Sequence, residues 1–143
     1  MITVKVDTES GEPPPISAEV VTSLVRLALM EGGGEASQIQ VVFADDEYLR
    51  RLKRQFFGQD HYTDVIAFQL NEPDEVLEGE IYISQERALE NSRLYQEPYS
   101  KELMRLVAHG CLHLTGHKDD TPEEQANMRV MENRILDLVS DPC

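Results

Sequence analysis

Long apolar runs are absent from this sequence. No segment approaches the roughly 18 apolar residues that a membrane-spanning helix needs, so a transmembrane protein is excluded. Residues 1–7 alternate apolar and polar side chains instead of placing an apolar stretch behind basic residues, so they do not form a secretory signal. We therefore expect a cytoplasmic protein with no membrane partner.

Cysteine and positive charge are also scarce. The two cysteines, Cys111 and Cys143, form no disulfide framework, which agrees with a cytoplasmic protein. The chain has 13 Lys and Arg residues against 27 Asp and Glu residues, a formal net charge of −14. Net charge therefore does not draw a polyanion to this surface. One basic cluster is the exception, and it is either a local phosphate-binding patch or a solvated helix face: Arg50, Arg51, Lys53 and Arg54.

The residues that are present fit one soluble domain. A chain of 143 residues can bury a single core and is too short for two ordinary domains, so residues 1–143 are predicted to form one. Strands are predicted at residues 1–7, 39–44, 63–70 and 80–84, the last two pairing as a hairpin. Helices are predicted after N-caps at Ser17, at Asp45 or Asp46, and at Ser84, Ser100 and Thr121, with residues 32–34 and Gly58 ending the first two. This order predicts an α+β (mixed α/β) fold, a small sheet of about four strands with helices packed over it.

The segment from His109 to Asp119 has the spacing of a metal site. Residues four apart lie on one face of a helix, so His109 and His113 can direct their imidazole nitrogens at one ion about 2 Å from each. Gly116 can end the helix in the left-handed conformation and turn the chain back. This turn makes Asp119 the preferred third ligand, with His117 as its competitor. Two imidazoles, one carboxylate and an open position are typical of a catalytic zinc site holding one ion.

Three sequence blocks resemble the YbeY family. Residues 109–119 (HGCLHLTGHKD) are similar to its His-Gly-x-Leu-His-Leu-x-Gly-x-x-(His or Asp) signature. Residues 52–68 (LKRQFFGQDHYTDVIAF) resemble its block ending in Thr-Asp-Val-Leu-Ser-Phe, and residues 79–84 (GEIYIS) resemble its Gly-Asp-Ile-x-Ile-Ser strand. Together these blocks cover about half of the chain in the family's order.

This resemblance implies a zinc-dependent endoribonuclease that cuts single-stranded RNA. It further implies a role in 16S rRNA 3′-end maturation and ribosome quality control, with rRNA and the small ribosomal subunit as partners. The local positive charge of the basic cluster makes it the expected RNA-binding surface. Two alternatives remain: a ribosome-associated metal-binding factor with weak catalysis, and a metallopeptidase. The metallopeptidase is disfavoured because the general-base Glu that follows the first histidine in such enzymes is Gly110 here.

The departures from the family concern charge near the metal. Phe57 and Gln59 stand where the family commonly has Arg and Lys, and Asp119 stands where most members have His. The basic cluster or Arg105, one turn before His109, could take over the role of the missing arginine. Glu80 and Asp64 are weak candidates for a catalytic base. Either could instead be structural, Asp64 as a hydrogen-bonding group of a turn or strand end. Four residues could stack on RNA bases or could be core or loop anchors: Phe56, Phe57, His61 and Tyr62.

Overall fold

The computed structural model describes residues 2–9, 11–33 and 36–140. Cys143 and Gly34, the latter part of the predicted end of the first helix, lie outside these residues. The elements follow the predicted order: β1 (Thr3–Thr8), α1 (Ala18–Gly32), β2 (Ala36–Ala44), α2 (Asp46–Phe57), β3 (Val65–Gln69), β4 (Leu77–Ser84), α3 (Gln85–Tyr95), α4 (Tyr99–Leu114) and α5 (Pro122–Ser140).

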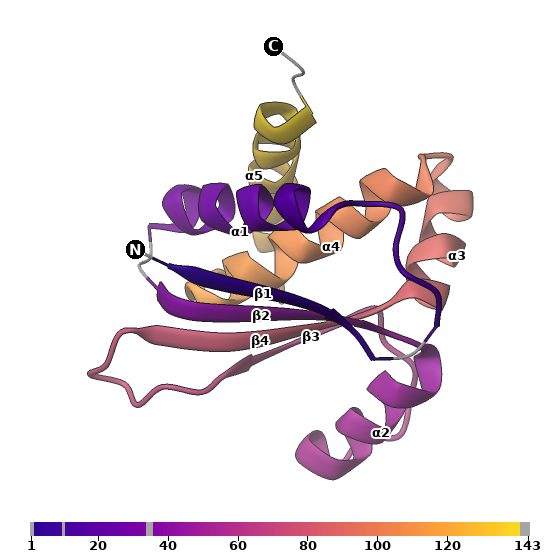
Figure 1. Ribbon diagram of the computed structural model, residues 1–143, viewed down its shortest axis with the longest axis horizontal. Helices are drawn as coiled ribbons and strands as arrows, with labels where there is room; N and C mark the ends of the chain where they lie inside the picture. The colour runs from indigo at the N-terminus through magenta and orange to yellow at the C-terminus, as the bar shows by residue number, and fades with distance from the viewer. Residues whose placement is uncertain (1, 10, 34–35, 141–143) are drawn as a thin grey trace.

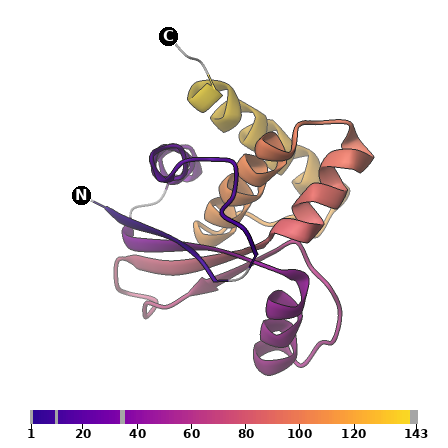
Figure 2. The same ribbon diagram turned by 45° about the vertical axis from the view of Figure 1, so that its right-hand side comes forward.

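The strands form one sheet in the order β1-β2-β4-β3. β1, β2 and β4 are parallel, and β3 runs antiparallel to β4, as predicted for the hairpin. Helices α1 and α4 lie across one face of the sheet, and α2 lies on the other side (Figures 1 and 2). The predicted α+β fold with a four-stranded sheet is therefore confirmed. Among the described residues no helix is both long enough and apolar enough to cross a membrane.

Most predicted helix starts are explained by capping side chains. Ser17, Asp45 and Ser84 each accept a hydrogen bond from the backbone N–H three residues later, which decides between Asp45 and Asp46. Thr121 and Glu124 cap each other's backbone N–H groups at 3.1 Å. Each cap supplies an acceptor for an N–H group that the helix itself leaves unpaired.

Several predicted boundaries are wrong. Ser100 is not an N-cap: α4 begins at Tyr99, because the extended backbone of Pro98 (φ −60°, ψ 143°) already sets the start, and no side chain caps it. The strands predicted to begin at residues 39 and 80 begin at Ala36 and Leu77, because these two residues pair with each other in the parallel ladder. Pairing across the sheet thus extended strands whose local sequence pattern is weak.

Two glycines let α4 lie close against β4. A Cβ atom at Gly110 would lie 2.7 Å from Cγ2 of Ile81, and one at Gly79 would lie 2.6 Å from Cδ1 of Leu114. Ile81 is fully buried, so it has little freedom to move aside. The close packing of α4 on the sheet fixes the helix that carries both histidines of the predicted metal site.

Candidate metal centre

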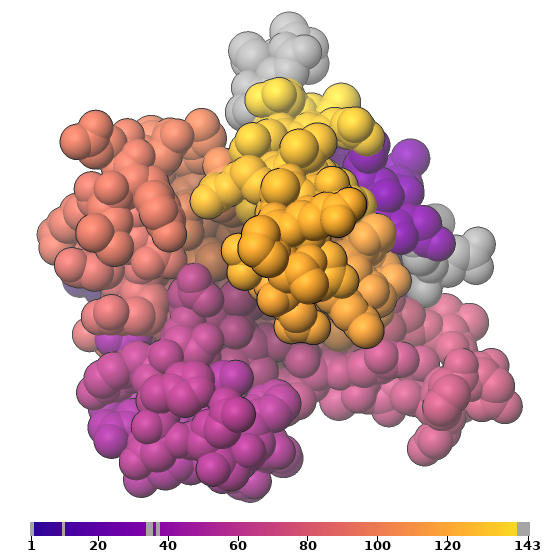
Figure 3. Space-filling model, turned by 180° about the vertical axis from the view of Figure 1, so that it is seen from behind, coloured from indigo at the N-terminus to yellow at the C-terminus, as the bar shows by residue number. Residues whose placement is uncertain are grey.

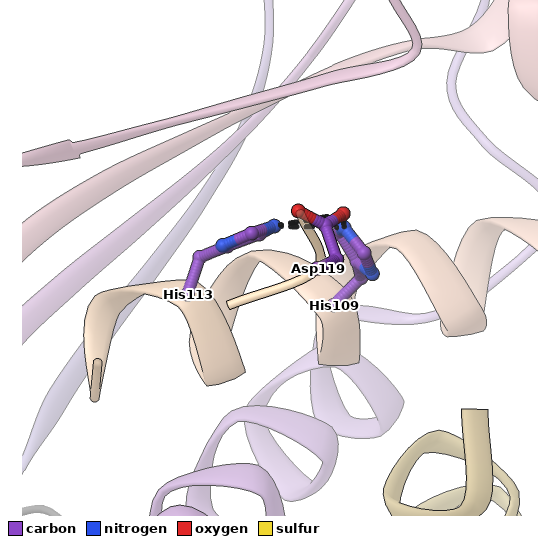
Figure 4. Close-up of side chains that lie close together, drawn as sticks. All are labelled: His109, His113 and Asp119. Carbon is purple, nitrogen blue, oxygen red and sulfur yellow. Dashed lines mark hydrogen bonds and ion pairs between the residues drawn. The ribbon is translucent and has the colours of Figure 1, made fainter. Parts of the chain in front are cut away.

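Three side chains converge at the C-terminal end of α4 (Figure 4). The Nε2 atoms of His109 and His113 lie 3.0 Å apart. Oδ2 of Asp119, in the segment between α4 and α5, lies 3.3 Å from Nε2 of His109 and 3.4 Å from Nε2 of His113. One atom from each residue therefore faces a common point. We call these three residues the triad.

The triad has the dimensions and donors of a zinc site. Ligand atoms of a tetrahedral zinc ion with bonds of about 2.05 Å lie about 3.3 Å from one another. The three observed separations match this value, and two imidazoles with one carboxylate are donors that zinc accepts. The triad is also partly exposed, which leaves a fourth position accessible to a small ligand. The residues present could therefore hold one metal ion.

The turn after α4 separates Asp119 from its competitor. Gly116 has φ +97°, a left-handed conformation that ends the helix and reverses the chain. His117 follows this turn in another direction, and its Nε2 lies 3.1 Å from the carbonyl oxygen of Gly32 at the end of α1. The structure thus brings Asp119 to the two histidines and places His117 against α1.

A buried carboxylate orients His109 from behind. Nδ1 of His109 donates a hydrogen bond to Oε2 of Glu132 on α5 at 2.6 Å, which leaves Nε2 free to face the ion. Burial alone lowers the pKa of His109, but the hydrogen bond and charge of Glu132, with the charges of Asp119 and Asp64, raise it above its ordinary value overall. Glu132 itself is only 4% exposed.

Glu132 is absent from the sequence-based predictions, although a signal for it exists. It lies four residues after Met128 and three before Ile135, and both of these are buried. An acid on the apolar stripe of an amphipathic helix needs a partner in the interior. Its partners are His109 and Arg105, and the latter donates to Oε1 of Glu132 at 3.3 Å.

Replacing Glu132 with Gln is expected to weaken zinc binding about tenfold or more, because partners of a ligating histidine commonly matter to that degree. The amide keeps the shape of the side chain and removes the charge that fixes the tautomer of His109. Competition with a chromogenic chelator measures the affinity. Glu123→Gln, at an exposed position on the same helix, is the matched control. Equal affinities of the two variants would contradict an orienting role for Glu132.

The three weak catalytic candidates lie in different places. Asp64 lines both cavities that adjoin the triad, and its Oδ2 accepts a hydrogen bond from Asn91 at 3.1 Å. Arg105 is 8% exposed and lies between the carboxylates of Glu102 and Glu132. Glu80 lies in neither cavity and accepts a hydrogen bond from Tyr82. Of the three, Asp64 and Arg105 adjoin the triad.

The predicted basic cluster separates into different environments. Lys53 lines a cavity of about 460 Å³ together with all three members of the triad. Arg50 donates to Oδ1 of Asp60 at 2.6 Å, and Arg54 lies 3.9 Å from the same oxygen. The guanidinium of Arg51 lies over the ring of Tyr48. Among these four bases, only Lys53 lines a cavity with the triad in the described part of the chain.

The aromatic residues near α2 are not core anchors. Phe56, Phe57 and Tyr62 are 58%, 46% and 50% exposed. The rings of Phe56 and Phe57 both contact Phe68 on β3, at centroid distances of 5.2 and 5.7 Å. Phe57 also lines the 460 Å³ cavity beside the triad. Of these rings, only that of Phe57 lines a cavity beside the triad in the described part of the chain. Tyr62 is instead held in its loop, because its hydroxyl donates to Oε1 of Glu47. The ring nitrogens of His61 contact Gln59 and Tyr62 in the same loop.

Comparison with known proteins identifies the family. The family model described as Endoribonuclease YbeY matches residues 6–140. An Endoribonuclease YbeY from Cytophaga hutchinsonii is 42% identical over 101 residues, 71% of each chain, and one from Phocaeicola vulgatus is 31% identical over 96% of this chain and 99% of its own length. The solution structure of TM1509 from Thermotoga maritima matches with a TM-score of 0.63 and 25% identity, covering 98% of both chains. The resemblance drawn from the three sequence blocks is thereby confirmed: this chain belongs to the YbeY family.

Proposed function

We propose that this protein is a zinc-dependent endoribonuclease that cuts single-stranded RNA. The observation that carries the proposal is the triad, whose three ligand atoms are spaced for one tetrahedral ion with an open position. The names of the relatives supply the reaction class, since they are endoribonucleases.

The chain's own groups are arranged to support hydrolysis. A bound zinc ion would lower the pKa of a water molecule and polarise a phosphoryl oxygen. His109 is held in one tautomer by Glu132, and Asp64 offers a carboxylate in both cavities beside the triad. In this proposal Asp64 accepts the proton from the attacking water, and Lys53 faces the phosphate.

The choice of substrate and of cellular location follows the family resemblance. We propose 16S rRNA as substrate, cut during maturation of its 3′ end and in ribosome quality control, and the small ribosomal subunit in the cytoplasm as the place of action. The neighbouring bases Arg50, Arg51 and Arg54 would attract RNA at longer range, with Lys53 nearest the metal. Local bases have this role because the net charge of −14 repels RNA.

One alternative retains a specific observation in its favour. A ribosome-associated metal-binding factor with weak catalysis fits Phe57 and Gln59, which stand where the family commonly has cations. A metallopeptidase is disfavoured by Gly110, where any larger side chain would collide with Ile81 and where no general base can stand.

Cleavage by protein loaded with one equivalent of zinc tests the proposal. Labelled single-stranded RNA covering the 16S rRNA 3′ end, the same sequence as a duplex, and casein are compared as substrates. We expect cleavage of the single strand alone, and loss of this cleavage when zinc is removed by a chelator. Tight zinc binding without RNA cleavage would favour the metal-binding factor, and casein cleavage would favour the peptidase.

A further inference from the structure

Two cavities meet at the triad from different sides. The first, of about 460 Å³, is lined by residues of α2 and β3, and the second, of about 320 Å³, by residues of α3 and α5. Asp64, His109 and Asp119 line both cavities. The helices α2, α3 and α5 come together on the face seen in Figure 3. A ligand strand crossing this face would therefore pass the triad with a cavity on either side.

Each cavity contains one aromatic ring with a cation over it. In the first, Nζ of Lys53 lies 4.7 Å from the ring centroid of Phe57. In the second, the guanidinium of Arg129 lies 5.7 Å from the ring centroid of Tyr95. Phe57 and Tyr95 are 46% and 55% exposed, so solvent reaches both residues. One face of the Phe57 ring is stacked on Phe68, which leaves the other face for a planar group. We call these the Lys53/Phe57 pair and the Arg129/Tyr95 pair.

The two cations are available for an anion. Neither Lys53 nor Arg129 has an ion pair within 4 Å in the described ranges, whereas Arg105 in the second cavity lies between two carboxylates. Among the described residues that line the two cavities, Lys53 and Arg129 are therefore the positive groups whose charge is not already neutralised by a close contact. A cation of this kind binds phosphate, and an exposed ring stacks on a base.

We propose that the Lys53/Phe57 pair and the Arg129/Tyr95 pair are two nucleotide subsites that hold a single RNA strand on both sides of the metal. This inference rests on the proposed function and names the residues that recognise its substrate. In each subsite the ring stacks on one base and the cation binds the adjacent phosphate. Stacking requires unpaired bases, so the arrangement also accounts for a preference for single strands.

The salt dependence of RNA binding tests the two cations. Binding of a short fluorescein-labelled single-stranded RNA is measured by anisotropy over a range of salt, with the protein kept free of zinc by a chelator so that the RNA is not cleaved. Loss of one phosphate contact reduces the slope of log K against log salt by about 0.7 for a single strand. We expect this loss in Lys53→Gln and in Arg129→Gln, and about 1.4 in the double variant, because the two cations contact different phosphates.

The controls use cations outside both cavities. Lys101→Gln removes a lysine that pairs with Glu97, and Arg134→Gln removes an arginine of α5 that pairs with Glu31. Both controls are expected to keep the wild-type slope. Phe57→Leu and Tyr95→Leu should weaken binding about tenfold, the typical effect of losing one stacked base, with the slope unchanged. Zinc stoichiometry and the melting temperature of each variant verify the fold.

The outcomes separate this inference from the proposed function. Wild-type slopes in Lys53→Gln and Arg129→Gln, together with RNA cleavage by the zinc-loaded wild-type protein, would overturn the subsites and leave the endoribonuclease intact. The expected slope changes in a protein that does not cleave RNA would support the subsites and overturn the endoribonuclease. If the salt slope fell in only one of the variants Lys53→Gln and Arg129→Gln, the arrangement of two subsites around the metal would be overturned.

Discussion

Replacing His113 with alanine is expected to abolish stoichiometric zinc binding and RNA cleavage together. Structural and catalytic zinc sites use at least three protein ligands, and the variant retains only His109 and Asp119. Mass spectrometry of metal in the dialysed protein measures the first effect, and cleavage of labelled single-stranded RNA measures the second. Both losses should be complete within error, the largest change that a single side chain of this protein can cause in metal content.

His117 provides the control for this result. His117→Asn removes an imidazole from the same segment, but its Nε2 contacts the carbonyl of Gly32 and not the triad, so zinc content should stay at one equivalent. Asp119→Asn should weaken zinc affinity roughly tenfold or more, since it removes the charged ligand. If His117→Asn weakened zinc binding more than Asp119→Asn did, His117 would be the third ligand. A full equivalent of tightly bound zinc in His113→Ala would place the site elsewhere.

The parts of the site that follow from local geometry were predictable from sequence. The helix period alone places His109 and His113 on one face, and Gly116 alone permits the reversal that returns Asp119. Glu132 was not predicted because it meets His109 only through the packing of α5 on α4, 23 residues along the chain. Long-range packing of this kind leaves no spacing rule in the sequence.

The basic cluster also shows that spacing in the sequence does not by itself decide which side chains reach the site. Bases that are adjacent in sequence are turned by about 100° per residue along a helix, so they cannot all face one ligand. Lys53 reaches the cavity beside the triad, while Arg50 is held by Asp60. Glu80 belongs to the strand that resembles the family, but it lies outside both cavities. Alternate residues of a strand face opposite sides of the sheet, so a strand match does not bring every side chain to the metal site.

The helix face that carries the histidines is also less exposed than its sequence indicates. Glu102 and Arg105 share that face in the sequence pattern, but they are 3% and 8% exposed because neighbouring helices cover them. Arg105 lies 3.8 Å from Glu102 and 3.3 Å from Glu132. Burial raises the pKa of Glu102 above its ordinary value, against the opposing hydrogen bond of Asn91 and the charge of Arg105. One buried arginine thus stabilises two buried acids.

Arg105→Met is therefore expected to destabilise the fold by about 3 kcal/mol or more, because it leaves buried carboxylates without their cation. For a chain of this size, that loss lowers the melting temperature by about 10 °C. Wild type and variant are melted in a chelator, so that release of metal does not contribute. A purely catalytic arginine would predict an unchanged melting temperature with reduced RNA cleavage.

The pH dependence of this destabilisation identifies Glu102 as its source. A carboxyl whose pKa is raised in the folded state stabilises the fold below its unfolded pKa, and this stability is lost as the pH rises through the folded pKa. Without Arg105 the folded pKa rises further, so the deficit of Arg105→Met should be small in acid and should grow towards neutral pH. Adding Glu102→Gln removes the ionisable group, and the double variant should recover part of the stability at neutral pH and lose this pH dependence. A deficit that is equal at acid and neutral pH would instead assign the loss to packing of the arginine side chain.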